Sequence, residues 1–245
     1  MHKQNTAYND LKALFINCSI KQDKAQSHTQ TLMDKAASVM SEQGVKIEHR
    51  YALDYEIAFG MVKDGNQEGQ TDDWPMIQQK IMDADILVIG TPIWLGAKSS
   101  VATQVIERMY AYSGDMNHKN QYAYYGKTGG CVITGNEDGA KHCAMDILYA
   151  MGHIGYTIPP QADCAWLGEA GPGPSYGDTE WDGKVLNPPA GFDNQFTNRN
   201  TTFMAWNLMH MARLLKDNNG LPAVGNTTEG WQEVTNAASD NPEYR

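Results

Sequence analysis

A polar loop that leads into a predicted helix start carries the clearest chemistry in this chain. Residues 18–26 are rich in Ser, Lys and Gln, and they run into Ser27-His28-Thr29-Gln30. The first N–H groups of a helix lack partners inside the helix, and the helix dipole adds about half a positive charge there. This helix start is therefore a candidate phosphate site, with donors from Ser19, Ser27, His28 and Thr29 and a positive charge from Lys21. The alternative is that Ser27 and Gln30 form only a capping box.

A second loop places an aromatic side chain at the end of an apolar segment. Residues 86–89 are Ile, Leu, Val and Ile, which predicts a central parallel strand covered on both faces. Gly90, Pro92 and Gly96 then turn the chain around Trp94. In open α/β sheets, ligands bind beyond the carboxyl ends of the strands, so Trp94 is a candidate platform for a planar ring. The alternative is that Trp94 caps the core.

A third loop, residues 135–139, follows a predicted strand at 129–134, and the usual nucleotide motifs are missing around it. No G-x-G-x-x-G follows the first strand. Residues 126–128 resemble the end of a Walker A loop, but Gln121 replaces the first glycine and a strand follows. The cysteines form no CxxC, and His142, Cys143 and His153 have poor spacing for a metal, so no metal site is predicted.

Alternating strands and helices are expected to position these three loops at one edge of a sheet. Strands are predicted at 11–17, 45–51, 86–89, 129–134 and from 156–158, the last one interrupted by Pro159-Pro160. Helices are predicted to start at Ser27, Trp74-Pro75, Ser99 or Ser100 and Ala140, with a final helix at 198–216. This pattern predicts an α/β fold with a doubly wound, five-stranded parallel sheet and a C-terminal helix.

The connecting segments and the composition complete the expected organisation. Residues 56–73 form a loop that either covers a site or is a plain surface insertion, and the Gly/Pro-rich residues 162–194 form a long loop. We expect one domain over 1–245, with a core at 11–217 and a tail at 218–245 that is frayed or lies over a neighbour. The net charge of -10 argues against nucleic acid or an anionic membrane as a partner. No apolar run is long enough for a signal peptide or a membrane span, which indicates a cytoplasmic protein.

Together, the three loops resemble the flavin-contacting loops of the flavodoxin-like NAD(P)H-dependent FMN reductases. The matching motifs are 17–19 with 27–29, 91–96 and 134–139, within a similarity that covers about 11–166. The resemblance implies FMN at the switch point of a 2-1-3-4-5 sheet. It also implies that Ser19, Ser27, His28 and Thr29 hold the phosphate. The implied ring-contacting residues are Thr91, Pro92, Ile93, Trp94, Leu95 and Gly96 on one side and Thr134, Gly135, Asn136, Glu137, Asp138 and Gly139 on the other.

The activity that follows from this resemblance is an FMN-dependent NAD(P)H oxidoreductase. Hydride would pass from the nicotinamide to FMN N5, and electrons would pass on to a quinone or another small acceptor. No side chain need act as acid or base, so no catalytic residue is assigned. A flavodoxin-type electron-transfer protein and an FMN-binding redox-regulatory module are the alternatives. The family also implies a homodimer or homotetramer, but it assigns no role to Trp166, Glu169 or Tyr176.

Overall fold

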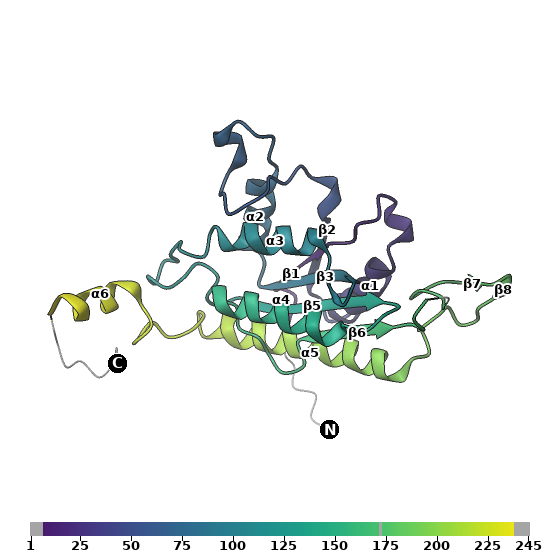
Figure 1. The fold of residues 1–245 in the computed structure, drawn as a ribbon. Helices are drawn as coiled ribbons and strands as arrows, with labels where there is room; N and C mark the ends of the chain where they lie inside the picture. The colour runs from purple at the N-terminus through teal and green to yellow at the C-terminus, as the bar shows by residue number, and fades with distance from the viewer. Residues whose placement is uncertain (1–6, 172, 238–245) are drawn as a thin grey trace, which may run out of the picture.

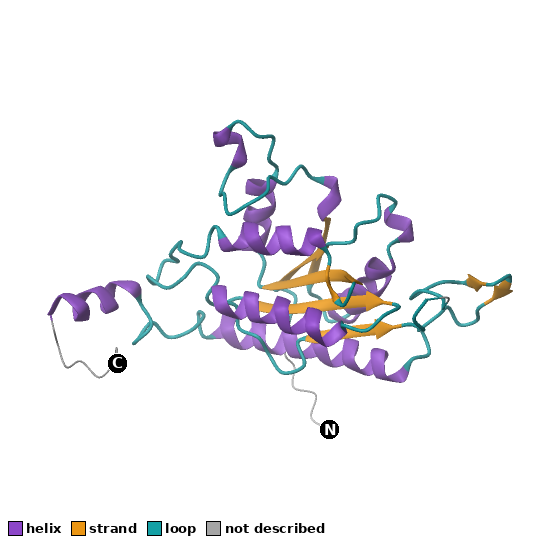
Figure 2. Cartoon of the chain, viewed as in Figure 1, coloured by secondary structure: helices purple, strands orange, loops and turns teal. Residues whose placement is uncertain are grey.

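Five parallel strands form the centre of the computed structural model, which describes residues 7–171 and 173–237 (Figures 1 and 2). They lie in the order β2-β1-β3-β5-β6, and a two-residue strand, β4, pairs antiparallel with β3. With β4 set aside, this is the predicted 2-1-3-4-5 order, so the predicted fold class is confirmed. The strands are β1 (Lys12–Asn17), β2 (Lys46–Tyr51), β3 (Ile86–Trp94), β4 (Ala97–Lys98), β5 (Thr128–Gly135) and β6 (Asp163–Leu167).

Helices cover both faces of this sheet. The hydrophobic cluster on one face joins β1, β3 and β5 to α1 and α5, and the cluster on the other face joins them to α2, α3 and α4. None of the described helices is long and apolar enough to cross a membrane. The helices are α1 (His28–Ser41), α2 (Trp74–Asp83), α3 (Ser100–Tyr110), α4 (Ala140–Ile154), α5 (Gln195–Asp217) and α6 (Thr228–Ala237), with short 3-10 turns at Lys24–Gln26, Ala52–Asp54 and Gly65–Glu68.

The alternation of side chains along β1 explains why both faces are covered. Ala13 and Phe15 belong to the cluster on the α1 and α5 side, whereas Leu14 and Ile16 belong to the opposite cluster. Successive residues of a strand point to opposite faces, so a strand that is apolar throughout is stable only between two layers of helices. Burying each large aliphatic side chain contributes about 1.5–3 kcal/mol. This layering leaves the carboxyl ends of the strands as the place for a site.

The last strand of the sheet begins later in the chain than the sequence pattern predicts. Thr157 makes only an isolated bridge to Thr128, and the fifth strand of the parallel sheet is β6, which starts at Asp163. Proline has no backbone N–H to donate to a neighbouring strand, so the pairing with β5 stops at Pro159-Pro160 and resumes beyond these residues. The predicted interruption at Pro159-Pro160 is therefore confirmed, since the chain contacts β5 at Thr157, leaves it at the prolines and pairs again as β6 at the edge of the sheet. The prediction that the long loop begins at 162 is wrong.

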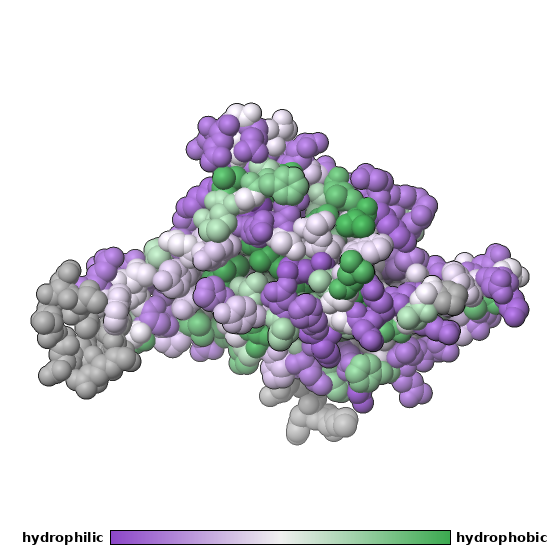
Figure 3. Space-filling model, in the orientation of Figure 1, coloured by the Kyte–Doolittle hydropathy of each residue, from purple (hydrophilic) through white to green (hydrophobic). Residues whose placement is uncertain are grey.

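Two further segments differ from expectation. A small hairpin, β7 (Glu180–Trp181) with β8 (Lys184–Val185), forms within the Gly/Pro-rich loop and projects from the body. Residues 228–237 form α6, which extends from the opposite side of the molecule (Figure 1), so the alternative of a frayed tail is wrong there, and the alternative that the tail lies over a neighbour stays a prediction. Residues 238–245 lie outside the described residues. Figure 3 shows that one face of the molecule is mainly polar, with apolar side chains gathered near its middle.

Candidate functional site

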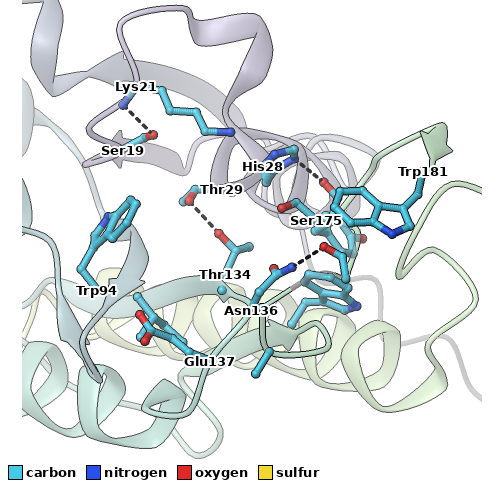
Figure 4. A pocket seen from close by; sticks show the side chains of 17 residues that line it. Ser19, Lys21, His28, Thr29, Trp94, Thr134, Asn136, Glu137, Ser175 and Trp181 are labelled. Atoms are coloured by element: carbon cyan, nitrogen blue, oxygen red, sulfur yellow. Dashed lines mark hydrogen bonds between the residues drawn. The ribbon is translucent and has the colours of Figure 1, made fainter. Parts of the chain in front are cut away.

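A cavity of about 610 Å³ lies beyond the carboxyl ends of β1, β3 and β5. Its volume is within the range of ligand pockets, which is about 300–1,000 Å³. Figure 4 shows Trp94 and Trp181 at opposite ends of the cavity, with Thr29 and Thr134 between them. The lining residues are Ser19, Lys21, His28, Thr29, Ile93, Trp94, Thr134, Gly135, Asn136, Glu137, Trp166, Ala170, Gly171, Gly173, Ser175, Tyr176 and Trp181.

The start of α1 presents polar groups to this cavity. The Ser27 side chain accepts a hydrogen bond from the Gln30 N–H at 3.2 Å, which is one half of the predicted capping box. The Gln30 side chain bonds Asp34 and His49 rather than the Ser27 N–H, so the second half does not form. The Thr29 hydroxyl lies 2.8 Å from the Thr134 hydroxyl. This contact joins the helix start directly to the end of β5.

His28 joins the same helix start to the Gly/Pro-rich loop. Its Nδ1 lies 3.0 Å from the Tyr176 carbonyl oxygen, and because a carbonyl only accepts, Nδ1 carries the proton. Burial and the nearby Lys21 lower the pKa of His28, against the opposing effects of Asp178 and the Tyr176 carbonyl. The imidazole is therefore neutral near neutral pH. A phosphate at this end would be held mainly by helix N–H groups, hydroxyls and Lys21.

Trp94 stands at the base of a tight hairpin between β3 and β4. The two residues at its tip, Leu95 and Gly96, both have positive φ, of 51° and 76°, as in the type I′ turns that close two-residue hairpins. Trp94 is 50% exposed and lines the cavity, so the alternative that it caps the core is wrong. The indole therefore lies at the cavity, and its role as a platform for a planar ring stays a prediction.

The predicted site residues divide into two groups. Those that line the cavity are Ser19, Lys21, His28, Thr29, Ile93, Trp94, Thr134, Gly135, Asn136 and Glu137. Ser27, Thr91, Pro92, Leu95, Gly96, Asp138 and Gly139 do not line it. Ser27 caps α1, and the buried Thr91 hydroxyl accepts a hydrogen bond from the Ser99 N–H at 3.0 Å. Both of these residues shape the loops, whereas the Leu95 side chain is 96% exposed.

The far wall of the cavity was not among the predicted site residues. It comes from β6 and the following loop, namely Trp166, Ala170, Gly171, Gly173, Ser175, Tyr176 and Trp181. The sequence feature that could have identified this wall is the occurrence of aromatic residues within a Gly-rich segment. Asn136 joins this wall to the β5 loop, because its side-chain NH₂ donates to the Gly173 carbonyl oxygen at 2.9 Å (Figure 4). The same NH₂ donates to the Pro174 carbonyl oxygen at 3.0 Å.

Replacing Asn136 with alanine is expected to loosen the wall. The loss of two hydrogen bonds of about 0.5–1.5 kcal/mol each corresponds to an increase of about 5- to 150-fold in the open population of the loop. Hydrogen–deuterium exchange at the Gly168 N–H, which donates to the Gly135 carbonyl at 2.9 Å where this loop meets β5, measures this opening. Asn207→Ala is the matched control, since the side chain of Asn207 bonds the Pro160 carbonyl and no other group among the described residues, and it should leave the exchange rate near that of the wild type. Equal exchange rates for both variants would contradict the assigned role of Asn136.

The comparisons with known proteins agree with this geometry. Residues 11–168 match the model of a family described as NADPH-dependent FMN reductase. The chain belongs to this family. The match includes β1, β3, β5 and β6, and therefore all three predicted loops. The resemblance stated from the sequence is confirmed.

Individual relatives extend the similarity beyond residue 168. The 8-demethyl-8-aminoriboflavin-5'-phosphate synthase of Streptomyces davaonensis is 36% identical, over 84% of this chain and 79% of that protein. A crystal structure of RosB with bound 8-demethyl-8-formylriboflavin-5'-phosphate has a TM-score of 0.79 and 32% identity, and covers 94% of this chain and 88% of that one. A short-chain flavodoxin, with a TM-score of 0.50 and 14% identity over 82% of this chain and 99% of that one, shares the fold.

A further relative differs greatly in length. The divalent metal cation transporter MntH of Mycobacterium bovis is 49% identical over 96% of this chain, but the chain spans only 32% of the length of that protein. In the part of the chain that the structure describes, no group of three or more His, Cys, Asp or Glu side chains is arranged to hold a metal ion.

Proposed function

We propose that the cavity binds FMN and that the protein is an FMN-dependent oxidoreductase that uses NAD(P)H. The observation that carries this proposal is the convergence of the α1 start, the Trp94 hairpin and the β5 loop on one cavity, in a chain of the FMN reductase family. When bound, FMN supplies the redox chemistry by accepting hydride from NAD(P)H and passing electrons to a quinone or another small acceptor. The protein supplies binding, orientation and exclusion of water.

The two ends of the cavity fit the two ends of FMN. The α1 start offers the first-turn N–H groups, the hydroxyls of Ser19 and Thr29 and the Lys21 ammonium, which are donors for a phosphate. The Trp94 indole and the Ile93 side chain offer apolar surface for a ring system. The Thr29–Thr134 contact lies between the two ends and holds the loops together. We therefore propose that the phosphate binds at the α1 start and that the ring system binds beside Trp94 and Ile93.

A second candidate is a reaction on the flavin itself. The relative from Streptomyces davaonensis is named for the synthesis of a modified flavin phosphate, and the RosB structure holds a modified flavin phosphate. The structural similarity to RosB covers 94% of this chain, and so extends beyond residue 168 into the region of the far wall, which the family model does not reach. In this alternative, FMN would be the substrate rather than a resident cofactor.

Three measurements on the purified protein test these functions. Fluorescence titration with FMN should give saturable binding, and the absence of binding would reject both candidates. NADPH oxidation by the FMN complex, followed with and without a benzoquinone, should show turnover that depends on the acceptor. Mass spectrometry of the flavin after turnover separates the candidates, because an unchanged mass supports the oxidoreductase and a changed mass supports flavin modification.

A further inference from the structure

Glu137 stands out among the residues that line the cavity. Its carboxylate lies on the same side of the cavity as Trp94 (Figure 4), and its Oε1 accepts a hydrogen bond from the Leu95 N–H at 2.9 Å. Among the described residues, no ion pair includes Glu137. The ammonium of Lys98, on the neighbouring strand β4, pairs with Asp146 instead. An acidic group without a paired cation therefore lines the end of the cavity where Trp94 lies.

The Leu95 contact holds this charge in place. The Glu137 Oε1 accepts the Leu95 N–H, so the carboxylate is tied to the tip of the Trp94 hairpin, although Leu95 itself does not line the cavity. Glu137 therefore places a fixed negative charge beside the ring position.

We propose that Glu137 sets the redox preference of the bound flavin, by favouring oxidised over reduced FMN and so lowering its reduction potential. This inference rests on the proposed function, because it requires FMN with its ring beside Trp94. Reduced FMN carries more negative charge in the ring than oxidised FMN, so a nearby carboxylate raises the free energy of the reduced complex more. Glu137 thus acts as a positioning and tuning residue, and it transfers no proton or electron itself.

The test compares the affinities of oxidised and reduced FMN in the wild type and in Glu137→Gln. Glutamine keeps an acceptor oxygen for the Leu95 N–H but removes the charge. We expect the ratio of the dissociation constants, oxidised over reduced, to rise about tenfold, which raises the two-electron potential by about 30 mV. Anaerobic fluorescence titration gives the constants, and spectroelectrochemistry gives the potential independently.

Two control variants make the result specific. Asp138→Asn removes the same charge one residue further along, from an exposed side chain that does not line the cavity, and should change the ratio by less than threefold. Glu137→Asp keeps the charge and should retain most of the wild-type preference. If Glu137→Gln binds FMN with the wild-type ratio, this inference is overturned while the proposed function stands. If the wild type binds neither form of FMN, the proposed function is overturned and the inference with it.

Discussion

Replacing Gly139 with alanine is expected to weaken FMN binding by about 100-fold, although Gly139 does not line the cavity. A Cβ at this position would lie 2.5 Å from the Gly96 carbonyl oxygen and 2.6 Å from its Cα. These are backbone atoms that cannot rotate aside, and Gly139 also has a φ of 124°, which strains any L-residue. The Trp94 hairpin and the β5 loop must therefore move apart. The affinity for FMN falls because binding of its ring depends on the spacing of these two loops.

Fluorescence titration with FMN measures the loss, and circular dichroism confirms that the variant is folded. Gly114→Ala is the matched control, because a Cβ there meets nothing within 4 Å and the residue lies beyond α3, outside the cavity lining. It should bind FMN like the wild type. A folded Gly139→Ala variant with wild-type affinity would show that the ring does not lie between these two loops.

Local sequence patterns were sufficient to predict the side of the cavity that comes from the α1 start, the Trp94 hairpin and the β5 loop. The apolar run of β3 indicates a central strand, and the order of strands and helices places its end beside the end of β1. The residues of the α1 start and of the β5 loop then meet by topology alone, as the Thr29–Thr134 contact shows. The location of a cavity between loops that follow parallel strands can be predicted from the strand order, without knowledge of side-chain packing.

The far wall depends on contacts that have no periodic signal. Gly168 and Gly191 are far apart in the chain, yet a Cβ on either would lie 2.4 Å from an atom of the Trp166 indole. These glycines allow the loop to close over the tryptophan on both sides. Their density in the sequence indicates a loop, but which ring they enclose is decided by the tertiary structure. Because the long loop was predicted to begin at 162, Trp166 was not assigned to a strand, and its position at the cavity was not predicted.

The segment between β2 and α2 illustrates the same limit, because a buried ion pair helps to hold it against α3. Asp72 and Arg108 are both fully buried, with the Asp72 Oδ2 2.6 Å from an Arg108 guanidinium nitrogen. Arg108 also donates to the Ala58 carbonyl at 2.7 Å. None of the cavity-lining residues comes from residues 56–73, so this segment folds against α3 and does not form part of the cavity wall. The charges of Asp72 and Arg108 are visible in the sequence, but their pairing is not.

Replacing Asp72 with asparagine is expected to lower the free energy of unfolding by about 3–5 kcal/mol. Both carboxylate oxygens accept hydrogen bonds from Arg108 and from backbone N–H groups, including that of Gly65 at 2.7 Å. An amide NH₂ would face donors in either orientation, and the buried guanidinium would lose its counter-charge. Urea unfolding followed by circular dichroism measures the change. Asp54→Asn, which breaks the exposed pair with Lys24, should cost no more than about 1 kcal/mol, and a similarly small cost for Asp72→Asn would contradict the anchoring role.

Acid titration provides an independent measure of the same ion pair. Burial raises the pKa of Asp72, but the Arg108 guanidinium and the N–H groups of Gly65, Ala58 and Trp74 outweigh it and hold the pKa at about 2, below its ordinary 3.8. The unfolded chain therefore binds a proton at Asp72 at a higher pH than the folded chain does. The stabilisation is fully present above pH 3.8 and is lost as the pH falls towards 2. Asp72→Asn has no such group, so its stability should fall less steeply than that of the wild type across this window, and parallel curves would mean that Asp72 does not carry the acid sensitivity.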